Sequence, residues 1–160
     1  MIPDLSSALS SSDPADAVLH AALAHFACQA GTVHVMRGGV LRLAAHVNIP
    51  PHLVEIIETV PIGKGVAGLA AQKCEPVSIC NLQTDTTGRA RPNAKQTGME
   101  GSIAVPMLVD GELTGVLGIA KAVEHDWTEA DKAELMEIGA QLGTRQIASE
   151  KDSEATGVDL

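Results

Sequence analysis

The first hydrophobic pattern along the chain predicts a helix over residues 14–27. Apolar residues recur there at the three- and four-residue spacing that places them on one helix face: Val18, Leu19, Ala22, Leu23 and Phe26. Asp13 and Pro14 stand where an N-cap and a first helical residue are expected. The pattern then changes to two short apolar runs separated by Gly38 and Gly39, and such a pair predicts a β-hairpin with a two-residue turn.

Short elements and one long polar stretch follow in the middle of the chain. Pro50 and Pro51 begin a predicted short helix whose apolar positions share one face: Leu53, Ile56, Ile57 and Val60. A second short helix is predicted over residues 66–72, and a strand over residues 76–80. Residues 83–98 contain no hydrophobic residue other than two alanines, which is typical of a functional or mobile loop inside a compact domain.

The last part of the chain predicts a second hairpin and a long helix. Residues 102–123 form two apolar runs joined by an Asp-Gly turn. Because these runs do not alternate between polar and apolar residues, we expect both faces of the sheet to be covered. Thr128 and Asp131 approximate a capping box before a helix that runs to about Ser149. The apolar arc of this helix is about twice the ~100° needed to dock on one core, so we expect a second contact.

Length and charge limit the classes of function. The 160 residues fit one domain, which we place at residues 13–149 between a flexible N-terminus (1–12) and a disordered acidic tail (150–160). The net charge is −9, and the acidic residues concentrate between residues 121 and 160, so no nucleic-acid partner is expected. The chain shows neither a signal-peptide pattern nor an apolar run near the ~20 residues of a membrane span, which favours a soluble cytoplasmic protein without a membrane partner.

One glycine pattern suggests nucleotide binding, but its context argues against it. Gly63, Gly65 and Gly68 have the G-x-G-x-x-G spacing of a dinucleotide-binding turn. In that motif the glycines follow a strand, whereas here a predicted amphipathic helix precedes them. A Walker loop would need Ser or Thr after Lys64, where Gly65 stands. We interpret the glycines as allowing a tight loop and close packing of the following short helix.

The cysteines and histidines give little support for a metal or redox site. Cys28, Cys74 and Cys80 form no C-x-x-C pair, so three reduced thiols are expected rather than a disulfide or a zinc site. His34 or His46 near the sheet could ligate a heme, but a hydrogen-bonded strand histidine is the favoured interpretation. No metal site is predicted, and the sequence names no cofactor.

Several motifs occur in an order that resembles a known family. They are "VPIGKGVAGLAAQKCEPVSICN", a polar loop, "GSIAVPMLVDGELTGVLGIA" and "HDWTEADKAELMEIGAQLG". On these motifs, residues 14–149 resemble a GAF domain. The resemblance implies an α+β fold with a central antiparallel sheet, the N- and C-terminal helices on one face and a ligand pocket with short helices and loops on the other. It also implies a regulatory or sensory module that often dimerises through those helices.

Two sequence differences from better-known members of the family argue against cyclic-nucleotide binding and against sulfoxide reduction. The N-K-F-D-E signature of cyclic-nucleotide-binding members is absent. The free methionine-(R)-sulfoxide reductases have G-K-G-V-C-G where this chain has "GKGVAG", so Ala67 replaces a cysteine of their redox chemistry, and the 83–98 loop contains no Cys. The sequence therefore favours a non-catalytic sensor. A divergent reductase is the enzymatic alternative, and a dimerisation module with an empty pocket is the third.

Two candidate sites follow from these arguments. Small Ser102 and Ala104 share a strand face and leave room for a ligand, while Arg89 and Arg91 could hold an anion. The predicted ligand-binding residues are Val66, Ala67, Val77, Ile79, Asn81, Arg89, Arg91, Ser102 and Ala104. The predicted dimer interface, where two glycines would let a partner helix approach, comprises Met136, Gly139, Ala140, Gly143 and Ile147. The expected partners are an unidentified small molecule, a second copy of the chain and a separate signalling protein.

Overall fold

The computed structural model describes the chain from residue 2 to residue 158, with side chains up to residue 148. Its elements follow in the order α1 (Ser6–Leu9), α2 (Pro14–Phe26), β1 (Ala30–Arg37), β2 (Val40–Val47), α3 (Pro51–Ile57), β3 (Thr59–Val60), α4 (Gly65–Lys73), β4 (Val77–Ile79), η1 (Pro92–Thr97), β5 (Gly101–Val109), β6 (Glu112–Lys121) and α5 (Glu129–Val158). The 3₁₀ helix η1 lies within the polar loop. The predicted helices and strands are all present, and α1, β3 and η1 are additional; Val60, predicted on a helix face, lies in β3.

The strands form one antiparallel sheet in the order β3-β2-β1-β6-β5-β4. Both predicted two-residue turns are confirmed: φ is 60° and 81° at Gly38 and Gly39, and 51° and 81° at Asp110 and Gly111. Positive φ at both central residues matches the twist of a two-residue hairpin. The two hairpins meet through β1 and β6, so the central strands come from opposite parts of the chain.

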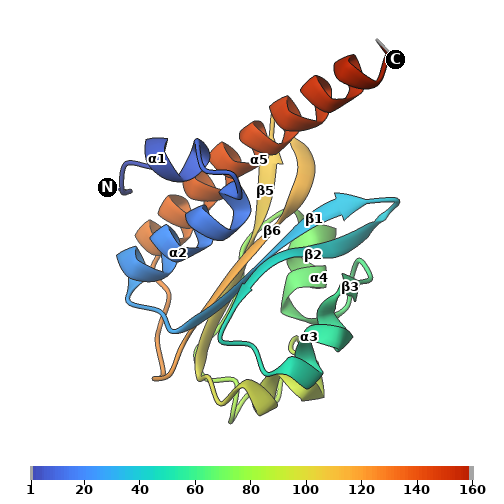
Figure 1. Cartoon of the computed structure of the whole chain (residues 1–160). Coiled ribbons are helices and arrows are strands. Elements are labelled where there is room, and N and C mark those ends of the chain that lie inside the picture. The colour runs from blue at the N-terminus through green and yellow to red at the C-terminus, as the bar shows by residue number, and fades with distance from the viewer. Residues whose placement is uncertain (1, 159–160) are drawn as a thin grey trace.

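The sheet separates two hydrophobic layers (Figure 1). Helices α1, α2 and α5 cover one face, and α3 and α4 lie on the other. The layer under α2 and α5, here called the helix-side core, includes Leu19, Phe26, Ile103, Leu117 and Leu142. The opposite layer includes Leu41, Val60, Ala70, Val77 and Val116. Both faces of the sheet are therefore covered, and the predicted α+β architecture is confirmed.

Gly31 of β1 lies where the sheet and α2 approach each other closely. An added Cβ would stand 2.8 Å from Leu19 Cδ1 and 3.1 Å from Leu23 Cδ2. It would also stand 2.8 Å from the backbone oxygen of Gly118 on β6, which cannot move aside as a side-chain end can, so this position requires glycine.

The N-terminus differs from its prediction. The sequence predicts a flexible segment over residues 1–12, but α1 lies against α2, and the Leu5 side chain is 2% exposed in the helix-side core. Ile2 and Leu9 pack against the same core, and Leu9 O accepts a hydrogen bond of 3.0 Å from Arg145 Nε. A four-residue helix is too short to show a hydrophobic period, so the pattern could not reveal this docking.

Helix α5 begins as predicted and ends later. Thr128 N donates to Asp131 Oδ2 and Asp131 N donates to Thr128 Oγ1, both at 3.1 Å, which makes a reciprocal capping box. The helical backbone continues to Val158, beyond the expected end at Ser149 and into the tail predicted to be disordered. No proline stops the helix in this stretch. Residues 159–160, and the side chains from Ser149 onward, lie outside the described part of the chain.

The wide apolar arc of α5 is divided between the sheet and the surface. An added Cβ at Gly143 would lie 2.5 Å from Thr114 Oγ1, and one at Gly139 would lie 3.2 Å from Met107 Cγ. The prediction that these glycines receive a partner helix is therefore wrong, because the sheet fills the space beside them. The part of the arc that stays half-buried, here called the α5 stripe, consists of Met136, Ala140 and Ile147.

Candidate ligand-binding site

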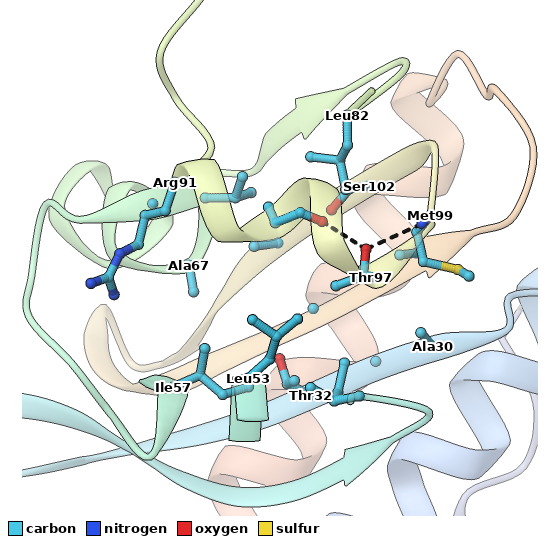
Figure 2. Close-up of a pocket in the computed structure, with 18 of the residues that line it drawn as sticks. Ala30, Thr32, Leu53, Ile57, Ala67, Leu82, Arg91, Thr97, Met99 and Ser102 are labelled. Atoms are coloured by element: carbon cyan, nitrogen blue, oxygen red, sulfur yellow. Dashed lines mark hydrogen bonds between the residues drawn. The ribbon is translucent and has the colours of Figure 1, made fainter. Parts of the chain in front are cut away.

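A cavity of about 180 Å³ lies between the sheet and a covering made by α3, α4 and the η1 segment (Figure 2). For comparison, an apolar cavity of about 150 Å³ is large enough to hold benzene. The space therefore suits a small organic molecule.

Small side chains on three adjacent strands make the floor of the cavity. Two rows of paired residues across β1, β6 and β5 face this side: Thr32, Gly118 and Ala104, then Ala30, Ala120 and Ser102. Residues two apart on a strand share a face, so the two rows lie next to each other. No side chain in these rows is larger than threonine, and this leaves the volume that a ligand needs.

Side-chain hydrogen bonds order the end of the η1 segment and connect the segment to α3. Thr97 Oγ1 donates to Ala94 O at 2.7 Å and accepts from Met99 N at 3.2 Å (Figure 2). His52 Nε2 of α3 lies 2.6 Å from Gln96 Oε1 of η1. The polar loop predicted to be functional or mobile thus forms the cover of the cavity, tied to α3 at one point.

Two basic residues lie at one end of the cavity. Arg91 and Lys64 both line it, and no Asp or Glu occurs among the described lining residues. Figure 2 shows Arg91 beside Ala67, at the end away from Met99 and Ala30. Arg91 Nη1 is buried and has no hydrogen-bond partner in the described part of the chain. This end of the cavity therefore favours a negatively charged or hydrogen-bond-accepting group.

The glycine pattern before α4 is explained by backbone geometry. Gly63 and Gly65 have φ of 90° and 69°, the left-handed region that favours glycine. An added Cβ at Gly68 would lie 2.6 Å from Pro61 O, so α4 packs closely on the turn that precedes it. An added Cβ at Gly65 would lie 3.0 Å from Cγ and Cδ of Arg91, so the arginine stem crosses the start of α4. The interpretation as a tight loop with close packing is confirmed.

The structure brings only part of the predicted ligand site together. The predicted residues that line the cavity are Val66, Ala67, Arg91, Ser102 and Ala104. Val77 and Ile79 are instead buried on the edge strand β4, at 4% and 2% exposure. The Asn81 amide donates to Glu100 Oε1 at 3.1 Å, and Arg89 donates to a threonine of its own loop. That the lining residues bind a ligand stays a prediction.

Sequence reasoning missed the contributions of β1, β6 and α3. Thr32 and Gly118 form the middle of the floor, and α3 supplies an apolar wall from Leu53, Ile56 and Ile57. The available signal was the run of small residues at alternate positions of both strands, which gains meaning only when the strand register is known.

His34 is the buried polar residue of the cavity wall. It is 2% exposed, and its Nε2 donates to Ile57 O at 2.9 Å, while Nδ1 is buried without a partner among the described residues. Burial lowers the pKa of His34, so the ring is neutral at neutral pH. The predicted hydrogen-bonded strand histidine is confirmed, whereas His46 is exposed and lies outside the lining. In the described part of the chain, no group of three or more His, Cys, Asp and Glu could hold a metal ion.

None of the three cysteines lines the cavity. Cys28 packs against the helix-side core, and burial raises the pKa of its thiol to about 11. Cys80 is exposed with Sγ 3.5 Å from Asp126 Oδ1, and desolvation followed by the nearby carboxylate raises its pKa. Cys74 is exposed at the end of α4. Cys28 and Cys80 are therefore protonated at neutral pH and weak as nucleophiles.

The sheet order, the paired terminal helices on one face and the covered cavity on the other agree with a comparison against known families. The model of the GAF domain family matches residues 8–144. This chain belongs to the GAF domain family. A search of curated protein sequences finds no match. Among the described helices of this GAF domain, none has the length and apolar composition needed to cross a membrane.

Solved structures share the fold at low sequence identity. The GAF domain of an Acinetobacter phosphoenolpyruvate-protein phosphotransferase is 18% identical with a TM-score of 0.77, covering 94% of this chain and 92% of that one. A free methionine-R-sulfoxide reductase from Neisseria meningitidis, in complex with its substrate, is 19% identical with a TM-score of 0.75, covering 92% and 87%. The A. aeolicus nlh2 GAF domain is 21% identical with a TM-score of 0.71, covering 91% and 92%. At these identities the likeness shows the fold alone.

Proposed function

We propose that this GAF domain is a non-catalytic regulatory module that binds a small molecule in the cavity beneath η1. The supporting observation is the cavity itself, an apolar space of about 180 Å³ with a small-residue floor, a cover and a few polar groups at one end. Small-molecule sites are commonly concave and mostly apolar, with few polar groups that orient the ligand. The described lining holds no Cys, Asp or Glu, so it is better suited to binding than to covalent chemistry.

A divergent free methionine-R-sulfoxide reductase is the second candidate, because solved structures of that name, from N. meningitidis and Thermoplasma acidophilum, share the fold. Reduction of a sulfoxide by thiols needs a thiolate at the substrate and a second thiol close enough to form a disulfide. In this chain Ala67 lines the cavity, and all three thiols lie outside the lining. This arrangement supports a binding module rather than a reductase.

The proposed output is a homodimer formed through the terminal helices. The α5 stripe of Met136, Ala140 and Ile147 is apolar and half-buried, on the face of the sheet opposite the cavity. A second copy, packed isologously on this stripe, would bury it. A separate signalling protein in the cytoplasm is the other proposed partner. The third candidate function is a dimerisation module whose cavity stays empty.

Native mass spectrometry of the purified protein tests binding and association together. We expect a dimer whose mass exceeds twice that of the chain by a bound small molecule, which dissociates on mild activation. A dimer without ligand, in the presence of cell extract metabolites, would instead support the empty dimerisation module.

A reductase assay separates sensor from enzyme. We expect no turnover of free methionine sulfoxide with thioredoxin, and unchanged ligand binding in a folded variant carrying Cys28→Ala, Cys74→Ser and Cys80→Ser. Sustained reduction by the wild type that disappears in this variant would restore the enzyme.

A further inference from the structure

We infer that the cavity takes a short aliphatic monocarboxylate, with its carboxylate at the Arg91 end and its alkyl chain over the small-residue floor. This inference rests on the proposed function, because it names the ligand class for the same cavity.

The volume of the cavity sets the size of the ligand. About 180 Å³ corresponds to roughly six water molecules at ~30 Å³ each, and it exceeds the cavity of about 150 Å³ that holds benzene. A molecule of roughly six to ten non-hydrogen atoms fits this space. A nucleotide has more than twice that number, roughly, and would extend beyond this space.

The charged residues around the cavity favour a ligand with a negative charge. Arg91 and Lys64 line one end, and the described lining has no acidic residue to neutralise them. Arg91 Nη1 is buried without a hydrogen-bond partner among the described residues, although its stem is fixed across Gly65. A buried donor of a charged group costs free energy until an acceptor reaches it, and a carboxylate is the acceptor that forms the strongest bond with a guanidinium.

The start of α4 adds donors at the same end. Gly65, Val66 and Ala67 all line the cavity, and no side chain caps this helix. The N–H groups of a first helical turn have no partner within the helix, and the helix dipole there favours an anion. These N–H groups would add hydrogen-bond donors for an anion beside Arg91.

The same charges disfavour an amine. An ammonium group in this cavity would lie near two basic residues and would find no carboxylate in the described lining. A simple carboxylate should therefore bind more tightly than an α-amino acid of the same chain length. The remaining lining supplies apolar contacts for the alkyl chain, from Leu53, Ile56 and Met99.

Three probes of similar size test the ligand class: isocaproate, its neutral analogue isocaproamide, and the cationic isohexylamine. Binding is measured by isothermal titration calorimetry and by the rise in thermal midpoint. We expect isocaproate to bind about tenfold or more tightly than the amide, since bonds to charged groups are roughly twice as strong as neutral ones. The amine should show no binding.

Variants of the polar loop test whether Arg91 causes the preference for the carboxylate over the amide. Arg91→Gln should lower isocaproate affinity much more than amide affinity and so remove the preference, and Arg91→Lys should retain part of the preference. Arg89→Gln is the matched control, because Arg89 lies in the same loop outside the lining. Its affinities should equal those of the wild type.

The outcomes separate this inference from the proposed function. Equal binding of amide and carboxylate, or an unchanged preference in Arg91→Gln, overturns the carboxylate class and leaves the cavity as a small-molecule site. Failure of all three probes to bind also overturns the class, while the proposed function is judged by the ligand that native mass spectrometry finds with the purified protein.

Discussion

Two glycines on β6 should respond in opposite ways to the same substitution by alanine. An added Cβ at Gly118 would face the cavity floor, where its nearest neighbours are Thr32 Oγ1 at 3.3 Å and Ile103 O at 3.8 Å. At Gly115 the same atom would overlap the backbone oxygen of His34 on the paired strand β1. Neither glycine has positive φ, so the contacts alone decide the outcome.

Gly118→Ala should stabilise the fold by about 1 kcal/mol. Replacing glycine where its backbone suits other residues contributes ~0.4–1 kcal/mol through the unfolded chain. The methyl group also fills part of an apolar cavity, which contributes up to ~0.8 kcal/mol, while crowding of Thr32 offsets some of this gain. For a chain of this size, about 1 kcal/mol raises the thermal midpoint by about 2–4 °C. Because the added methyl group takes up cavity volume, this variant should also bind isocaproate more weakly.

Gly115→Ala should destabilise by about 1–3 kcal/mol, because the backbone of β1 or β6 must move to remove the overlap. Urea denaturation followed by circular dichroism gives the free energy of unfolding of both variants under one set of conditions. If both variants shift in the same direction, or if Gly118→Ala lowers the thermal midpoint, the floor of the cavity is not open in the way described.

Three further outcomes are expected. Because burial lowers the pKa of His34 from 6.5, the unfolded chain gains a proton that the folded chain does not, so the free energy of unfolding should fall as pH drops below about 6.5. The fall should be shallower in His34→Gln when urea denaturation is repeated across pH. If the proposed dimer forms, Ile147→Glu should weaken it in sedimentation with little loss of stability. Gly143→Glu, whose side chain would meet the sheet, should instead unfold the monomer, and a folded, monomeric Gly143→Glu would contradict this placement. His52→Ala removes the contact with Gln96 and should speed ligand exchange in stopped-flow measurements, and an unchanged rate would show that this contact does not restrain the cover.

The sequence predicts well those parts of the fold that depend on local backbone chemistry. Two-residue turns at Gly38-Gly39 and Asp110-Gly111 fix both hairpins, and the capping box fixes the start of α5. Each of these features involves residues within a few positions of one another. Their geometry is therefore visible before any tertiary contact is known.

The candidate site depends on contacts between distant segments and is predicted only in part. Ser102 and Ala104 are predictable because they alternate on one strand, whereas their neighbours Ala120 and Gly118 follow only from the pairing of β5 with β6. The contacts of the α5 glycines could not be predicted from the sequence for the same reason. A small residue on a helix permits close approach but does not indicate which surface approaches. For Gly143 that surface is the sheet.

A ligand in the cavity and the helices on the far side of the sheet are separated by the thickness of one strand. Thr32 faces the cavity, and the preceding residue, Gly31, meets Leu19 and Leu23 of α2 on the other face. Because Gly31 has no side chain, the side chains of Leu19 and Leu23 pack directly against the backbone of β1. A ligand that shifted β1 would therefore act on α2 through one layer of leucine side chains, since packed protein transmits strain with little compression. In the proposed sensor, the residue that faces the ligand and the residue that meets the helix are thus neighbours on a single strand.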